Sequence, residues 1–407
     1  ALVGRVIDRP ILEAILTLAP HLTPIEGIDS WLLGCLNNAV LEVFDGGARF
    51  AHDKMREVLR IDVIERGDLP ALSRSIALAI EHAYPDMAQR ALRAAVLAEY
   101  WHYAGDSDRE AVALELAAQL ALENALYDQA LEFIVRARPL VAGDRNASAR
   151  LNAQATEAHY NLGALERAQN EAMDTLTLLG FRLTVEVAEQ ERALPRLISR
   201  FVMGRGRRRL THLPRVARRA PSMRMEANER NLIALKLLER LTMIHYFRNQ
   251  RTEVVYFSLN AMTIAEATDP GRYLERARGY TTAAIALGSS RQRLARFFVR
   301  RADRAARHVD DPNTLVWHNL GTGILAVVMT DWDEADRRLR RSIEIARATA
   351  NWRRAEEGLV TLAGAYYYQG RWNETRALND ELRAAAERIR DLQASAWVLD
   401  NLSLIHI

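Results

Sequence analysis

The sequence predicts an all-α fold in which pairs of helices stack into a superhelix behind a small N-terminal domain. Three observations predict it. A small residue recurs at a fixed period from residue 130 onwards, apolar residues at helical spacing flank each recurrence, and residues 1–65 follow a different pattern. Such a period is typical of helical repeat arrays, because one helix pair cannot bury its apolar face alone.

Residues 1–65 begin with two predicted helices. Asp8 precedes an apolar pattern over Arg9–Leu18, and a second such pattern covers about Glu26–Asn37. An aspartate at this place can accept hydrogen bonds from the first free N–H groups of a helix. We therefore expect Asp8 to cap the first helix.

A β-hairpin and a third helix are predicted next. Apolar and polar residues alternate in Val40–Phe44 and Ala48–Ala51 across Asp45-Gly46-Gly47, which is a hairpin signature. The third helix covers about His52–Ile61, and we expect its inner side to carry Met55, Val58 and Leu59. Two helices, a hairpin and a helix form a winged-helix outline.

The repeat region is defined by one small residue in each unit. Successive positions are separated by 38, 86, 41, 40 and 40 residues, and the step of 86 corresponds to about two units. Helices need small side chains where their axes approach to about 8–10 Å. The positions are Ala130, Ala168, Val254, Ala295, Ala335 and Thr375.

Turns and caps agree with this period. Gly163 and Gly370 precede the small residues Ala168 and Thr375 by five residues each, where a turn between two helices is expected. Asp311-Pro312 and Asp269-Pro270 suit the starts of later helices, because the missing proline N–H costs nothing in a first turn. In the last unit, apolar or small residues at helical spacing are Leu359, Ala363 and Tyr366, then Thr375, Asn379 and Leu382.

These spacings resemble the tetratricopeptide repeat. The resemblance implies a right-handed α-α superhelix of tetratricopeptide-like repeats preceded by a small winged-helix domain. The usual unit has about 34 residues, so the longer period implies helices about one turn longer. An irregular all-helical domain is the alternative.

Composition sets outer bounds on the class of protein. The chain has 407 residues, 49% of them apolar, so more than one module is expected. One cysteine, Cys35, excludes an internal disulfide framework, and we find neither a signal peptide nor an apolar run of about 18 residues. A cytoplasmic chain without membrane association is expected. The net charge of +3 carries no prediction of nucleic-acid binding.

Two segments carry a family resemblance. Ala1–Asp8 and Ala48–Glu57, followed by helical repeats, resemble the winged-helix and repeat region of bacterial STAND-type signalling ATPases. The similarity extends to large fusions of this module with a serine/threonine kinase or a class III nucleotide cyclase. It implies an upstream P-loop ATPase domain as an intramolecular partner, with His52 near the phosphates of ATP or ADP and Asp53 beside it. Alternatively, His52 and Asp53 only cap the helix.

No Gly-x-x-x-x-Gly-Lys-Ser/Thr segment occurs in the chain, so ATP or ADP would be held by a phosphate-binding loop before Ala1. The resemblance divides the chain into a winged-helix-like domain (1–65), a first repeat block (66–190), an arginine-rich insertion or divergent repeat (191–225) and a second repeat block (226–401). Ser403–Ile407 resemble translated sequencing-adapter read-through and are not interpreted.

The arginine-rich segment is a candidate docking site. Between Arg192 and Arg224 there are eleven arginines and no acidic residue, and Gly204-Arg205-Gly206 and Pro214 are expected to interrupt the helix. A dense arginine patch can hold phosphates or acidic protein segments; alternatively, a divergent repeat carries solvated arginines. Base-stacking aromatic residues are nearly absent, which disfavours nucleic acid. The candidates are Arg205, Arg207, Arg208, Arg209, Arg215, Arg218 and Arg219.

A concave groove is the second candidate site. In tetratricopeptide arrays the first helix of each unit lines such a groove, and its apolar and aromatic residues suit a protein or peptide partner. Ordinary packing between helices is the alternative, and complete burial of Trp317, Tyr367 and Tyr368 would exclude the groove. The candidates are Lys236, Met243, Tyr246, Phe247, Tyr280, Leu287, Trp317, Leu320, Ile324, Tyr367 and Tyr368.

Enzymatic and metal-binding motifs are not found. No His-x-x-x-His or Cys-His pair of metal-ligand type, no Gly-x-Ser-x-Gly elbow and no kinase signature occurs, so no catalytic or metal-binding residue is assigned. Two functions follow as hypotheses. The first is a regulatory interaction module that relays partner binding to an attached ATPase, kinase or cyclase. The second is an ATP-dependent transcriptional regulator, which binds DNA through the winged helix or a missing C-terminal helix-turn-helix.

Overall fold

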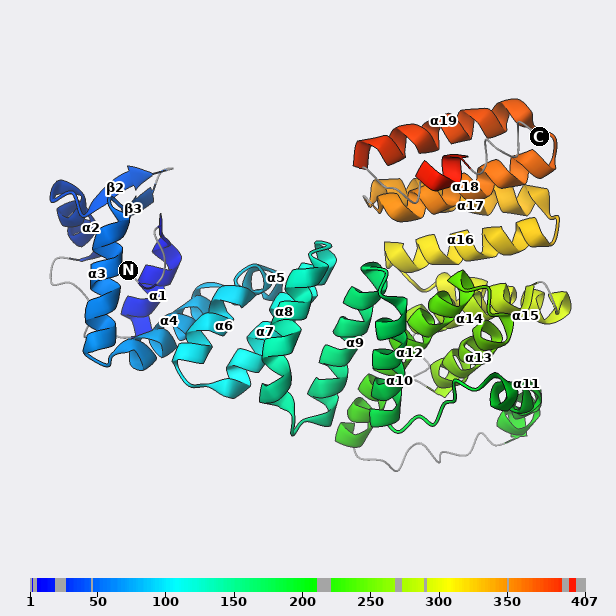
Figure 1. The fold of residues 1–407 in the computed structure, drawn as a ribbon, viewed down its shortest axis with the longest axis horizontal. Helices are drawn as coiled ribbons and strands as arrows, with labels where there is room; N and C mark the ends of the chain where they lie inside the picture. The colour runs from blue at the N-terminus through cyan, green and yellow to red at the C-terminus, as the bar shows by residue number, and fades with distance from the viewer. Residues whose placement is uncertain are drawn as a thin grey trace. The chain divides into compact units, whose positions relative to one another are not determined.

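The computed structural model describes residues 2, 6–18, 27–44, 47–210, 221–267, 273–288, 291–349, 351–389 and 395–399, excluding the side chains of 200–210 and 221–227. The chain divides into two compact units, Ala1–Glu171 and Ala172–Ile407. Helices dominate both, and successive helices pack against one another (Figure 1). The predicted class, all-α with stacked helix pairs, is confirmed.

The first unit opens with a small sheet and three helices. The predicted order is observed: α1 (Arg9–Leu18), α2 (Ile28–Asn37), β2 (Leu41–Phe44), β3 (Gly47–Phe50) and α3 (Asp53–Glu65). A short strand, β1 (Val6–Ile7), pairs antiparallel with β3, so the sheet order is β1-β3-β2. Asp8 caps α1 as predicted, because its Oδ1 accepts a hydrogen bond from the N–H of Ile11. Glu26, Asp45 and Gly46 lie outside the described residues.

The prediction for the inner side of α3 is wrong. Met55, Val58 and Leu59 are exposed, Val58 at 63%, and no residue of α3 is buried. Helical spacing places residues on a common face of a helix, but it does not determine whether that face meets protein or solvent.

The rest of the first unit is a row of helices whose neighbours in sequence pack together. Its core includes Trp101, Leu114, Ile134 and Leu151, all nearly inaccessible. The helices are α4 (Leu69–Ala83), α5 (Met87–Ala91), α6 (Ala94–Tyr103), α7 (Ser107–Glu123), α8 (Tyr127–Ala137), a 3₁₀ turn (Arg138–Val141) and α9 (Arg145–Asn161). The division between the units falls within α10 (Leu165–Leu178).

The second unit contains four regular helix pairs. They are α12 (Pro221–Phe247) with α13 (Arg251–Ala267), α14 (Tyr273–Gly288) with α15 (Gln292–Ala306), α16 (Pro312–Val328) with α17 (Trp332–Ala348), and α18 (Trp352–Tyr368) with α19 (Trp372–Ile389). The first helices also contact each other in the series α12, α14, α16 and α18. None of the described helices is both long and apolar enough to cross a membrane.

The recurrent small residue occupies the same place in every pair. It is the fourth residue of α8, α10, α13, α15, α17 and α19, as in Ala130 of a helix that begins at Tyr127. The four alanines are fully buried, and Thr375 nearly so. Two residues before each of five second helices the backbone has a positive φ, at Ala125, Gly163, Asn249, Thr330 and Gly370. Of these five turn residues, only Gly163 and Gly370 can be recognised as such in the sequence.

The skipped step of the period is explained by a single helix, α11 (Val187–Leu210), which packs on α13. The prediction that Gly204 and Gly206 interrupt the helix is wrong, because α11 continues through both. A glycine costs a helix only about 1 kcal/mol relative to alanine, so two of them need not end it. Pro214 lies outside the described residues.

Caps and glycines fix the helix ends and the closest helix crossings. The cap at Asp311-Pro312 is confirmed, since Asp311 Oδ2 accepts a hydrogen bond from the Thr314 N–H at 2.7 Å. Asp269-Pro270 lies outside the described residues. At Gly358 of α18, a Cβ atom would lie 2.6 Å from Ile343 Cγ1 of α17. A helix crossing this close requires a residue without a side chain.

We expect Gly358→Ala to lower the free energy of unfolding and Gly364→Ala, in the same helix, to raise it. Alanine favours the helix by about 1 kcal/mol at both positions. At Gly358 the added methyl group overpacks the crossing, which typically costs about 1–3 kcal/mol. At Gly364 it meets nothing within 4 Å. Urea unfolding at constant m-value measures both changes, and equal effects would contradict the close crossing.

Candidate functional site

A groove lies along the first helices of the second unit. It has a volume of about 330 Å³ and is lined by side chains from α12, α14, α16 and α18, by one residue of α13 and by the helical segment 395–399. Its walls are mainly apolar and aromatic. The lining residues are Thr242, Met243, Tyr246, Phe247, Val254, Thr282, Ile285, Ala286, Trp317, Leu320, Ile324, Arg354, Glu357, Val360, Thr361 and Trp397.

Trp317 forms the fixed floor of the groove. Its indole N–H donates a hydrogen bond to Thr282 Oγ1 at 3.3 Å, and its side chain is only 6% exposed. The Arg354 guanidinium lies over the indole ring at 4.9 Å and also pairs with Glu357. The one charged pair of the lining is therefore internally compensated and held against an aromatic surface.

An ion pair sets the spacing of two neighbouring first helices. Arg278 of α14 donates from Nη2 to Glu239 Oε1 of α12 at 2.9 Å. Burial alone would raise the pKa of Glu239, but the charges of Arg278 and Arg240 outweigh it and hold this pKa below its usual range. The pair therefore joins adjacent repeats beside the groove as ionised groups.

Six of the eleven predicted groove residues line the groove. They are Met243, Tyr246, Phe247, Trp317, Leu320 and Ile324. Tyr246 and Phe247 are the most accessible of them, Tyr246 at 52%. Their rings meet edge to face at 5.8 Å. The two exposed rings present apolar area at the edge of α12, next to the loop that leads to α13.

Tyr280 and Leu287 do not face the groove. Both are buried in a cluster with Phe298 of α15. Burial and the nearby charge of Glu266 raise the pKa of Tyr280 to about 12. Nine of the sixteen residues of α14 are buried, so its periodicity did not reveal which face meets the groove. The opposite face, with Thr282 and Ile285, does so.

The remaining three predictions lie outside the groove lining. Lys236 is exposed on α12. Tyr367 is half-buried and meets Trp372 edge to face at 5.2 Å, whereas Tyr368 is 69% exposed. On α18 the groove is lined instead by Arg354, Glu357, Val360 and Thr361. Sequence reasoning also missed Trp397, although it follows Trp317 by 80 residues, two steps of 40.

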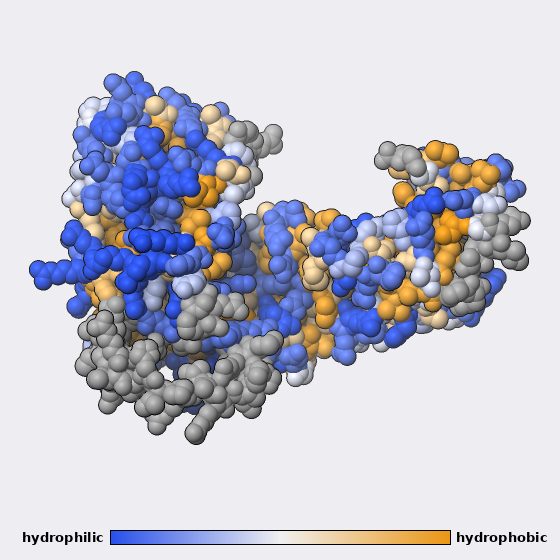
Figure 2. Space-filling view, turned by 180° about the vertical axis from the view of Figure 1, so that it is seen from behind, coloured by the Kyte–Doolittle hydropathy of each residue, from blue (hydrophilic) through white to orange (hydrophobic). Residues whose placement is uncertain are grey.

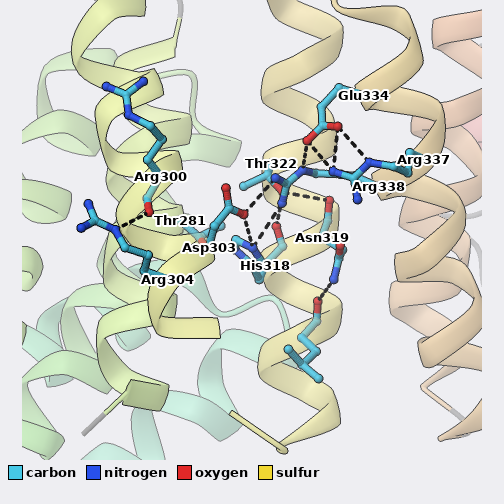
Figure 3. Close-up of polar contacts among 11 residues, drawn as sticks. Thr281, Arg300, Asp303, Arg304, His318, Asn319, Thr322, Glu334, Arg337 and Arg338 are labelled. Atoms are coloured by element: carbon cyan, nitrogen blue, oxygen red, sulfur yellow. Dashed lines mark hydrogen bonds and ion pairs between the residues drawn. The ribbon is translucent and has the colours of Figure 1, made fainter. Parts of the chain in front are cut away.

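A polar network links the helix pairs α14–α15 and α16–α17 (Figure 3). Arg338 of α17 is at its centre, with a side chain only 8% exposed. Its guanidinium donates to Glu334 at 2.5 Å, to Asp303 at 2.9 Å and to Thr322 at 3.0 Å. His318 Nε2 donates to Asp303 Oδ1 at 3.0 Å, and Nδ1 lies 2.9 Å from Thr281 Oγ1.

The network keeps its carboxylates ionised. Burial would raise the pKa of Asp303, but hydrogen bonds from His318 and Arg338 and the Arg338 charge hold it below its usual range. Burial would also raise the pKa of Glu334, but hydrogen bonds from Arg337 and Arg338 and the charges of both hold it below its usual range. A cavity of about 450 Å³ with both charged and apolar lining residues adjoins these groups among α15, α16 and α17. Because all three nitrogen atoms of the Arg338 guanidinium contact protein oxygen atoms, we assign the network to structure.

The nucleotide candidates lie at the start of α3. His52 is the N-cap residue with an extended backbone, and its exposed side chain makes no cap hydrogen bond. Asp53 is exposed in the first turn. Among the arginine candidates, Arg205, Arg207, Arg208 and Arg209 belong to α11 by their backbone. Their side chains, and all of Arg215, Arg218 and Arg219, lie outside the described residues.

Across the described ranges, no three or more His, Cys, Asp or Glu side chains gather in a way that could hold a metal ion. The carboxylates Asp303 and Glu334, which lie close together, form ion pairs with Arg338 instead.

Comparisons with known proteins give structural likeness alone. No family model and no curated protein matches the chain. One similar solved structure is the APC/C hetero-tetramer Cut9–Hcn1, with 14% identity, a TM-score of 0.27, and coverage of 85% of this chain and 71% of that one. Another is a STAND protein with a tetratricopeptide repeat sensor from Pyrococcus horikoshii, with 16% identity and a TM-score of 0.29. This chain matches it over 98% of its own length but spans only 62% of that protein. Because both TM-scores are below 0.5, the fold assignment is based on helix packing within this chain.

We expect Asp303→Asn to destabilise the chain by about 1–3 kcal/mol at pH 7, because it removes a charged partner of the buried Arg338. The pKa of Asp303 is lower folded than unfolded, so its stabilisation is present above the unfolded value, near 4, and is lost as pH falls through the folded value. The difference between variant and wild type should therefore shrink below about pH 4. Urea unfolding at pH 7, 5 and 3.5 tests this, with the exposed Asp310→Asn as control. A difference independent of pH would rule out the ionised network.

Proposed function

We propose that this chain is a non-catalytic protein-interaction module whose groove in the second unit binds an apolar peptide segment or amphipathic helix. One observation carries the proposal. First helices of successive repeats bring apolar and aromatic side chains to one continuous groove, with Trp317 held rigid at its floor. Grooves of this kind bind one face of an amphipathic helix through a few buried anchors.

The charges at the groove also favour binding over catalysis. Arg354 and Glu357 pair with each other, so neither is available as a general acid or base. The hydroxyl groups of Thr242 and Thr282 are used in hydrogen bonds to backbone carbonyls of their own helices. The groove therefore presents a mainly apolar surface, with few polar groups that could fix the orientation of a bound peptide.

We further propose that partner binding is relayed to an attached STAND-type ATPase domain with a kinase or cyclase output. The resemblance of Ala48–Glu57 to that family supports this proposal. Two features of α3 are compatible with it: none of its residues is buried, and the His52 imidazole is exposed without a cap hydrogen bond. An upstream domain could contact both. ATP or ADP would be bound by that domain, with His52 as a sensor of its phosphates.

Peptide display tests the groove. We expect a library of random amphipathic 16-residue helices, selected on the full chain, to yield binders with apolar anchors at positions i, i+4 and i+7. Tyr246→Ala should weaken these binders about tenfold, since exposed aromatic anchors contribute on the order of 1–2 kcal/mol. Tyr368→Ala is the matched control, because it removes an exposed tyrosine outside the groove. Equal loss in both variants, or no loss in either, would exclude the groove.

A further inference from the structure

A row of five arginines follows the outer face of α15. Figure 2 shows hydrophilic surface at the edge of the second unit where this helix lies. The arginines are spaced by 3, 4, 4 and 3 residues, and all are exposed on the side opposite the buried Ala295, Phe298 and Ala302. Over fourteen residues the row is about 21 Å long. It consists of Arg293, Arg296, Arg300, Arg304 and Arg307, named here the arginine row.

No ion pair to any member of the arginine row is found within the described part of the chain, although Arg304 Nε donates a hydrogen bond to the backbone carbonyl of Arg300 at 3.1 Å. The only acidic residue of α15, Asp303, is engaged by His318 and Arg338. The neighbouring second helix, α17, differs. Its five arginines, Arg337, Arg338, Arg340, Arg341 and Arg347, all form ion pairs.

Repulsion between neighbouring arginines of the row opposes the helical conformation of α15. Like charges three or four residues apart destabilise a helix by about 0.2–0.5 kcal/mol per pair. The apolar face of α15 already fixes the helix in the array through Ala295, Phe298 and Ala302. The packing of α15 therefore does not depend on the row, and an anionic partner would reduce the repulsion between its arginines.

The cavity beside the row restricts the kind of anion. Arg296 and Arg300 line one wall of the 450 Å³ cavity, and Asp331 and Asp333 line it from the start of α17. Both aspartates are exposed, and Asp331 makes no cap hydrogen bond. A uniform polyanion along the row would meet these two carboxylates at close range and be repelled. A partner with acidic groups toward α15 and a basic group toward α17 would be attracted electrostatically to both walls of the cavity.

We propose that the arginine row and the adjoining cavity form a docking surface for an acidic protein helix. Such a helix carries Asp or Glu at i, i+4 and i+7 facing α15 and a Lys or Arg facing Asp331 and Asp333. Arginine suits this role because its planar guanidinium binds a carboxylate through two parallel hydrogen bonds. The cavity and the groove have no lining residue in common, so the two sites are separate.

The test uses a fluorescent 16-residue helical peptide with Glu at i, i+4, i+7 and i+11 and two Lys on the adjacent face. Anisotropy with the full chain at low salt should show saturable binding that weakens as salt screens the charges. Arg296→Ala with Arg300→Ala should weaken binding at least about tenfold, as expected for loss of charge-assisted pairs. Arg341→Ala with Arg347→Ala, which changes the net charge equally on α17, should change it less than about twofold. Asp331→Asn with Asp333→Asn should abolish the preference for the peptide with Lys over one with Ala in its place.

Four results would overturn the proposal. They are no binding of the glutamate peptide, the same loss in both arginine double variants, no lysine preference in the wild type, and tighter binding to a 16-base-pair DNA duplex or to vesicles containing phosphatidylserine. Circular dichroism of each variant confirms that the helices remain folded. Because these substitutions lie outside the groove, failure here leaves the peptide-display result on Tyr246 unchanged.

Discussion

Close contact between two helices at one small residue is the constraint on which the repeat region depends. In five of six second helices the fourth residue is buried, and alanine occupies four of these positions with no accessible surface. A larger side chain there would separate the helices and open voids along the core. The same constraint explains Gly358, where a methyl group would overlap Ile343.

Because the first helices of successive pairs contact one another, side chains of four first helices come to one surface. The groove is a consequence of this stacking. Trp317 is held by Thr282 from the preceding repeat and covered by Arg354 from the following one, so one side chain depends on three helix pairs. Such a floor is rigid without any dedicated loop, which lowers the entropy cost of binding a partner.

Charge is distributed differently on the second helices. On α17, arginines are paired with carboxylates of the same helix or its neighbours, and Arg338 uses its donors to join two repeats. On α15, the exposed arginines form no ion pairs with carboxylates among the described residues. Similar composition thus gives a structural network on one helix and a charged surface on the next.

The fold class, the period, the cap at Asp311 and the burial of the small alanines can all be predicted from the sequence, because they depend on local spacing and on backbone chemistry. Six of the residues that the sequence suggested for a groove lie in the lining of the observed one. On α14, with most residues buried, the sequence suggested the face with Tyr280, which packs on α15. Which face lines the groove and which arginines are paired became clear from helix packing alone. Both depend on the residues that neighbouring helices bring alongside, and spacing within one helix contains no information on its neighbours.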